Sequence, residues 1–118
     1  MPRLRTIITA AASALTLLLA LPGSASAEVS GHFYYSYTDA NGDHQVDLYT
    51  NQEGECTDVK EVADGDAKFA FSPLNKTTNE LWVFTELTCT GDKFILAADA
   101  QGTQANKFAS YYFVPPRD

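Results

Sequence analysis

Short segments of alternating aromatic and polar residues, separated by turn-forming residues, constrain the fold of this chain more than any other feature. In Gly31–Thr38 (GHFYYSYT) the alternation places one Phe and two Tyr on a single face. Gln45–Thr50 alternates in the same way, and Asn41–Gly42 lies between the two segments. Because Asn-Gly pairs adopt the positive φ angles of tight turns, this stretch predicts a β-hairpin.

Further strands are expected at residues 68–72, 81–88, 93–97 and 107–114, and residues 56–62 are either a strand or a single helical turn. In the first of these segments the alternation predicts that Phe69 and Phe71 point inward. The polar stretch Pro73–Glu80 is expected to be a connection. No amphipathic helical pattern of useful length follows residue 27. Such a series of short strands is typical of a small antiparallel sandwich or barrel, so we expect an all-β fold.

The first 27 residues are expected to be removed from the working protein. Arg3 and Arg5 precede the apolar run Ile7–Leu21, and Ala25–Ala27 has the small-x-small form of a signal-peptidase site. This order is typical of a secretory signal peptide, and the apolar run is short for a membrane span. We therefore expect a secreted protein with one domain over residues 28–118, no membrane attachment in its mature form, and a short extended tail from Pro115.

The mature chain is strongly acidic. Loss of Arg3 and Arg5 from the eight basic residues leaves six against 15 Asp and Glu, which gives a formal charge of −9. Such a surface repels phosphate, so nucleic acid and anionic membranes are not expected partners. Basic proteins, cations, neutral sugars and cell-wall polymers remain possible partners. The acidic charge can also serve solubility alone, without any partner.

The two cysteines, Cys56 and Cys89, both lie in the exported part. In an oxidising compartment the simplest expectation is one disulfide between them. It would close a loop of 34 residues. The chain-entropy model gives about 3–4 kcal/mol for such a loop, a large share of the stability of a small domain.

A known motif is visible around the second cysteine. In Phe84–Gly91 (FTELTCTG), the Phe and the Gly fit the Greek-key motif of βγ-crystallins, and Cys89 stands where the second aromatic would be. Together with Gly54-Glu55-Cys56, this stretch resembles small secreted actinobacterial proteins of the βγ-crystallin-like peptidase-inhibitor type. The resemblance spans about Tyr49–Ala97 and implies a small antiparallel Greek-key sandwich (βγ-crystallin-like). The crystallin calcium signature is absent, since its nearest stretch, Asn75–Thr78, fails at the second position.

Catalytic and metal-binding patterns are poorly represented. The only imidazoles are His32 and His44, and no serine lies in a G-x-S-x-G context. Two histidines and two oxidised cysteines do not form a zinc set. Asp39–Asp43 opens like an EF-hand loop but lacks its Gly and Glu, so a plain turn and a weak cation site are both open. We expect no enzyme, no cofactor and no metal. Asn75-Lys76-Thr77 matches the N-glycosylation pattern, which we interpret as incidental behind a bacterial-type signal.

Two kinds of surface are candidates for partner binding. The first is the excess of large aromatic side chains that one core cannot hold, and its members are Tyr34, Tyr49, Trp82 and Tyr112. Burial of these strands on both faces is the competing interpretation. The second is the pair of acidic loops, residues 51–55 and 64–66, of which Gly54 and Glu55 would be braced by the disulfide. Their competing interpretation is a solvated connection.

Three functions follow as hypotheses. The first is a secreted, non-catalytic module that binds an extracellular protein, most like a protease inhibitor that inserts the loop around Gly54 and Glu55 into a cleft. The second is an adaptor subunit of a larger secreted assembly, such as an antibacterial toxin particle, with the strands at Phe33–Tyr37 and Tyr111–Phe113 as a permanent interface. The third is a small carbohydrate or cell-wall binder.

Overall fold

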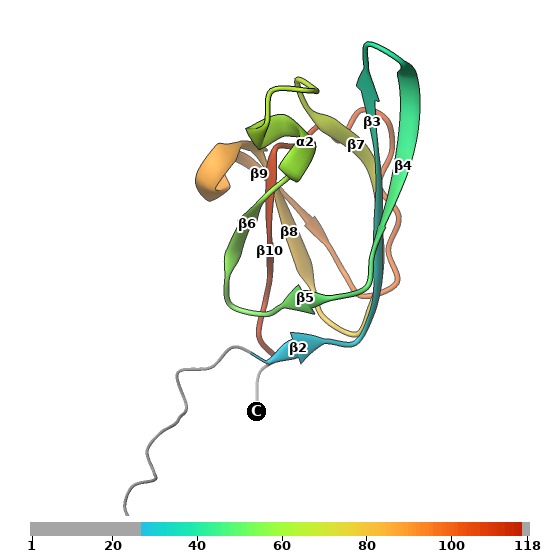
Figure 1. The fold of residues 1–118 in the computed structure, drawn as a ribbon. Coiled ribbons are helices and arrows are strands. Elements are labelled where there is room, and N and C mark those ends of the chain that lie inside the picture. Colours follow the sequence, from blue (N-terminus) through green and yellow to red (C-terminus); the bar gives the residue numbers. More distant parts are fainter. Residues whose placement is uncertain (1–26, 117–118) are drawn as a thin grey trace, which may run out of the picture.

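The computed structural model describes residues 27–116, which form two antiparallel β-sheets packed face to face (Figure 1). The three-stranded sheet has the order β4 (Gly42–Leu48), β3 (Gly31–Asp39), β7 (Ala70–Thr77). The four-stranded sheet has the order β6 (Cys56–Asp58), β10 (Ser110–Phe113), β8 (Leu81–Glu86), β9 (Thr90–Leu96). Short elements complete the chain: β2 (Glu28–Val29) pairs with β5 (Asn51–Gln52), and α2 (Lys60–Ala63) and the 3-10 turn η4 (Leu87–Cys89) lie in connections.

The predicted all-β sandwich is confirmed. The predicted signal segment up to residue 26 and the last two residues of the predicted tail lie outside the described range. Within residues 27–116, no helix has the length and apolar character needed to cross a bilayer.

The first half of the chain contributes a strand to the sheet of the second half, and the second half reaches the three-stranded sheet through isolated bridges. β3 and β4 form a hairpin, the chain then crosses to form β6 beside β10, and it returns as β7 beside β3. In the second half, β8 and β9 form a hairpin, Gln101 bridges to Leu74 of β7, and the chain returns as β10 beside β8. The orders β4-β3-β7 and β9-β8-β10 are therefore equivalent, and two Greek keys interlock to form the sandwich.

Aromatic rings from the facing sheets fill the core. The ring of Phe33, fully buried on β3, lies 5.0 Å from that of Tyr111 and 5.8 Å from that of Phe113, both edge-on. Tyr35 and Phe108 extend the same cluster. Edge-to-face pairs of this kind each contribute about 0.5–1.5 kcal/mol beyond the area that they bury. The alternation of β3 was therefore interpreted correctly, with Phe33 and Tyr35 inward and Tyr34 outward.

The expected orientation of the next strand was wrong. On β7 it is Ala70 that points inward, fully buried, whereas Phe69 and Phe71 remain partly exposed and their rings contact each other at 6.3 Å. The cause is local backbone geometry: Ser72 adopts φ +53°, and the register with β3 shifts at this point. Such a bulge re-aims the neighbouring side chains.

The stretch Pro73–Glu80 is also not the connection that its polarity predicted, because β7 continues to Thr77. Asn75 is fully buried, and its Nδ2 donates to the carbonyl oxygens of Asn79 and Ala97 at 2.8 and 3.1 Å. Its Oδ1 accepts hydrogen bonds from the backbone N–H and the hydroxyl of Thr77. Polar side chains thus point inward because the fold supplies their partners. A side chain held in this way is not an acceptor for a glycan.

The predicted disulfide joins Cys56 on β6 to Cys89 at the end of η4, with Cα atoms 6.0 Å apart. The hairpin between β8 and β9 folds back at this corner, and Gly91 adopts φ +84°. A Cβ at Gly91 would lie 2.3 Å from Thr85 Oγ1, so only glycine fits there. Ser110, fully buried, accepts a hydrogen bond from the Cys89 N–H at 2.8 Å and donates one to the Glu86 carbonyl.

Candidate functional site

The loop before the disulfide is exposed and fixed in place. Gly54 and Glu55 are solvent-exposed between β5 and β6. The Gly54 N–H donates to the Phe113 carbonyl at 2.8 Å, Glu53 pairs with Phe113 in a parallel bridge, and Cys56 is tied to Cys89. The loop therefore presents its side chains on a backbone that is already ordered, which lowers the entropy cost of docking.

One row of side chains connects this loop to the middle of the four-stranded sheet. Cys56 pairs with Tyr112, Tyr112 with Trp82, and Trp82 with Ile95, each on the neighbouring strand. Directly paired residues point to the same side of a sheet, so the row lies on the outer face, away from the core. We call loop 53–55 and this row the disulfide face. Its most exposed large apolar residue is Ile95, at 59%.

Trp82 is engaged on its ring and at its edge. Its ring stacks against Tyr112 at 5.5 Å, and Lys93 Nζ lies 3.8 Å from the ring centroid. These two contacts come from β10 and β9, the strands on either side of β8. The indole Nε1–H donates to Glu80 Oε2 at 2.6 Å. The Trp82 side chain is therefore held in place by three contacts, and its ring is not free to stack on a ligand.

A hollow of about 310 Å³ opens beside Trp82, lined by residues 78–80, Trp82 and residues 114–116. Its two sides are cross-linked, because the Val114 N–H donates to the Glu80 carbonyl at 2.9 Å and Asn79 Nδ2 donates to the Val114 carbonyl at 3.0 Å. The sequence analysis missed Glu80 and Pro115 as wall residues. The signal was the Glu-x-Trp spacing at the start of a strand, which puts a carboxylate and an indole on one face.

The predicted partner-binding residues do not form one site. Tyr112 and Trp82 lie on the disulfide face next to Gly54 and Glu55, as described above. Tyr34 and Tyr49 belong instead to the outer side of the three-stranded sheet. There the His32 ring lies 5.8 Å from that of Tyr34 and 6.1 Å from that of Tyr49, which is 68% exposed. We call His32, Tyr34 and Tyr49 the tyrosine face.

Both histidines hydrogen-bond to aspartates across the β3–β4 hairpin. His32 Nδ1 lies 2.7 Å from Asp47 Oδ1, and His44 Nε2 lies 2.9 Å from Asp39 Oδ1. The His44 ring also stacks on Tyr37 at 5.1 Å. Each imidazole thus links one strand of the hairpin to the other.

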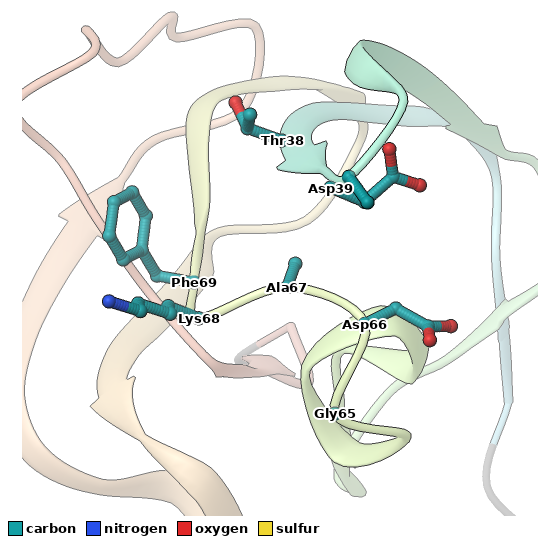
Figure 2. Close-up of a pocket in the computed structure, with 8 residues that line it drawn as sticks. Thr38, Asp39, Gly65, Asp66, Ala67, Lys68 and Phe69 are labelled. Carbon is teal, nitrogen blue, oxygen red and sulfur yellow. The ribbon is translucent and has the colours of Figure 1, made fainter.

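A second hollow, of about 500 Å³, lies between the tip of this hairpin and the loop after α2 (Figure 2). Lys68 and Phe69 lie on one side of it and the carboxylates of Asp39 and Asp66 on the other. The Asn41 N–H, donated to Asp39 Oδ1 at 2.8 Å, is the main cause that lowers the pKa of Asp39, and the bond from His44 adds to it. Among residues 27–116 no three His, Cys, Asp or Glu side chains are grouped as metal ligands. The Asp39 carboxylate serves the turn of the hairpin.

The buried tyrosines show how α2 is held against the core. Tyr35 donates its hydroxyl proton to Glu61 Oε1 at 2.7 Å. Burial, followed by this bond, raises the pKa of Tyr35 well above its usual value. Burial and the nearby Glu61 charge raise the pKa of Tyr111 to about 12. Both phenols are therefore neutral at physiological pH.

We compared the chain with protein-family models, with curated proteins and with solved structures, and none of the three comparisons gave a match. Its function therefore has to be inferred from its own residues and their arrangement.

Proposed function

We propose that this protein is a secreted, non-catalytic module that binds another extracellular protein through the disulfide face. The observation that carries the proposal is the register Cys56–Tyr112–Trp82, which joins a fixed, exposed loop to two large aromatic side chains on one surface. Tyr and Trp are enriched at protein interfaces, where large and rigid side chains gain contact area at low entropy cost. A disulfide-bonded chain fits the oxidising conditions outside the cell.

In its finer form, the proposal is a protease inhibitor of the βγ-crystallin-like type, in which Gly54 and Glu55 enter the cleft of the enzyme. Two observations support it: the exposed loop has anchored ends, and the chain folds as a small all-β sandwich with a disulfide. Glu55 is an exposed loop residue in an acidic chain, so the matching protease surface is basic.

The test is a panel of extracellular metallo- and serine proteases mixed with the purified protein, read by residual activity and by complex formation on size exclusion. We expect one protease class to be inhibited, and Glu55→Lys to weaken that inhibition about tenfold through the reversed charge. Asp66→Lys makes the same charge change at another exposed loop and is expected to inhibit like the unmodified protein. Complex formation without inhibition would reject the finer form alone. No complex with any protease or with proteins of the native culture fluid would reject both.

The adaptor hypothesis needs a changed interface. Phe33 and Tyr35 of the first proposed strand, and Tyr111 and Phe113 of the second, are core residues and are not available to a partner. The tyrosine face nevertheless gives this alternative a specific observation, since it lies on the other sheet from the disulfide face. An adaptor would hold one partner on each face. The test is to recover bound proteins from native culture fluid. Two partners bound at once, one lost with Tyr49→Ser and the other with Tyr112→Ser, would support an adaptor over an inhibitor.

Carbohydrate binding receives less support from the geometry at Trp82. Sugars stack on an open aromatic ring, whereas the Trp82 ring is contacted by Tyr112 and Lys93 from its two neighbouring strands.

A further inference from the structure

We propose that the hollow beside Trp82 binds a lysine or arginine side chain of the protein that docks on the disulfide face. The inference rests on the proposed function and specifies the chemistry of the partner. The hollow, about 310 Å³, has room for one long side chain, with the carboxylate of Glu80 at its wall. A carboxylate beside apolar walls matches a cation at the end of an aliphatic stem.

The Glu80 carboxylate is held in position for this role. Oε2 accepts the Trp82 Nε1–H at 2.6 Å, which fixes the orientation of the group and leaves Oε1 for a second donor. The backbone of Glu80 is fixed as well, since its carbonyl accepts the Val114 N–H at 2.9 Å. A preorganised acceptor binds a charged donor more strongly than a mobile one.

Part of the remaining wall suits the aliphatic portion of such a side chain, and Thr78 and Asn79 add polar groups to it. Pro115 and Pro116 offer apolar rings without backbone N–H groups, and Val114 adds a branched side chain. Lys93, a cation already present, lies over the Trp82 ring and belongs to β9, whereas Glu80 is hydrogen-bonded to the indole edge. Recognition would therefore run through the charge-assisted hydrogen bond to Glu80 and not through the ring face.

The hollow is continuous with the loop that we propose to be inserted into the partner. A methyl group at Gly54 would contact Pro115 Cγ at 3.5 Å, so the loop lies next to a residue that lines the hollow. A partner that covers Glu55 would also cover the mouth of the hollow. Its surface must complement the acidic groups Glu55 and Glu80, which again favours basic side chains.

The test uses the isolated protein and small probes. Nα-acetyl-arginine amide and Nα-acetyl-lysine amide are titrated while the Nε1–H resonance of Trp82, the only tryptophan, is followed by ¹H–¹⁵N NMR. Nα-acetyl-norleucine amide is the uncharged control. We expect the resonance to shift with the two cationic probes only, and the shift to saturate at millimolar probe concentrations.

Two matched variants locate the effect. Glu80→Gln keeps an acceptor for the Trp82 Nε1–H but removes the charge, and it is expected to weaken binding of the arginine probe about tenfold. Glu86→Gln makes the same change at the other end of β8 and is expected to leave binding as it is. Equal shifts with the norleucine probe, no saturable shift, or equal losses in both variants would each overturn the inference.

The same variants separate this inference from the function on which it rests. If the partner complex forms and Glu80→Gln leaves its affinity unchanged, the hollow does not bind a basic side chain of the partner. The proposal that the partner binds on the disulfide face would still stand. If Glu55→Lys and Glu80→Gln both leave the affinity of the complex unchanged while Tyr49→Ser lowers it, the disulfide face is wrong as well.

Discussion

Ser110 Oγ accepts a hydrogen bond from the Cys89 N–H at 2.8 Å, so a fully buried hydroxyl in the centre of the four-stranded sheet holds the corner that carries the disulfide. The same hydroxyl donates to the Glu86 carbonyl, at the start of that corner. The corner is thus fixed twice, by a sulfur bridge to β6 and by a hydroxyl on β10.

Replacement of this hydroxyl should loosen the corner. Ser110→Ala leaves the Cys89 N–H and the Glu86 carbonyl without their partner, which costs about 1–3 kcal/mol of unfolding free energy. Urea unfolding monitored by Trp82 fluorescence measures the loss. Ser36→Ala, on the outer side of β3, is the control and should change the free energy by less than about 0.5 kcal/mol. Equal effects of the two substitutions would argue against a special role for Ser110.

Two glycines with the same backbone angle separate conformational strain from steric conflict. Gly91 has φ +84° and Gly65 has φ +85°, but a Cβ at Gly91 meets Thr85 Oγ1 and Glu86 Cγ, whereas a Cβ at Gly65 meets nothing within 4 Å. Gly65→Ala should cost about 1 kcal/mol for the left-handed conformation alone. Gly91→Ala should cost at least about 2 kcal/mol more, measured by thermal unfolding of both variants. Similar costs would mean that the corner between β8 and β9 adapts to a side chain.

The buried amide of Asn75 should be the most costly polar side chain to remove. Asn75→Ala removes the hydrogen bonds that this amide makes to the Thr77 N–H and to the carbonyl oxygens of Asn79 and Ala97, so we expect a loss of about 3 kcal/mol. Thr78→Ala, at an exposed neighbouring position, is the control. Chemical denaturation with both variants gives the comparison, and a loss below about 1 kcal/mol would show that water replaces the amide.

The β3–β4 hairpin should lose stability in acid. The pKa of Asp39 is lowered from 3.8, mainly by the Asn41 N–H and also by His44, so its contribution is present above the unfolded pKa and is lost as the pH falls through the lower folded value. Unfolding free energies measured at successive pH values below about 5 should therefore decline, and the decline should be shallower in Asp39→Asn. Asp92→Asn, in the other hairpin, serves as the comparison. An unchanged slope in Asp39→Asn would remove Asp39 from the acid response.

The strands that the sequence predicted well are those whose inward residues are apolar. The alternation around Phe33 and Tyr35 on β3 indicates their buried face, because a strand turns every second side chain to the core. The disulfide was equally predictable, since the chain holds only two cysteines.

β7 was not predictable in this way, and the reason is the environment that other strands supply. Asn75 and Thr77 look solvated in sequence, yet they are buried because Asn79 and the end of β9 offer hydrogen-bond partners. The reversal of Phe69 and Phe71 depends on the bulge at Ser72, which no local pattern specifies.

The candidate site was predicted in its residues but not in its arrangement. Large aromatics and the loop at Gly54 were identified from composition and the cysteine context. Their division between two faces follows from strand order, which places Tyr112 between Cys56 and Trp82 and leaves Tyr34 on the other sheet. The hollow beside Glu80 depends on where residues 114–116 lie after β10, and the sequence pattern does not predict their position.

β6 belongs to the first half of the chain but pairs with β10 in the sheet of the second half. Neither half alone therefore contains all the strand pairs of its sheet. If the chain were cut between β7 and β8, the first fragment would contain β6 without its pairing partner. In the second fragment, one edge of β10 would have no paired strand. The two halves are therefore expected to fold and unfold together, and proteolysis that removed either half would also remove strands on which the proposed disulfide face depends.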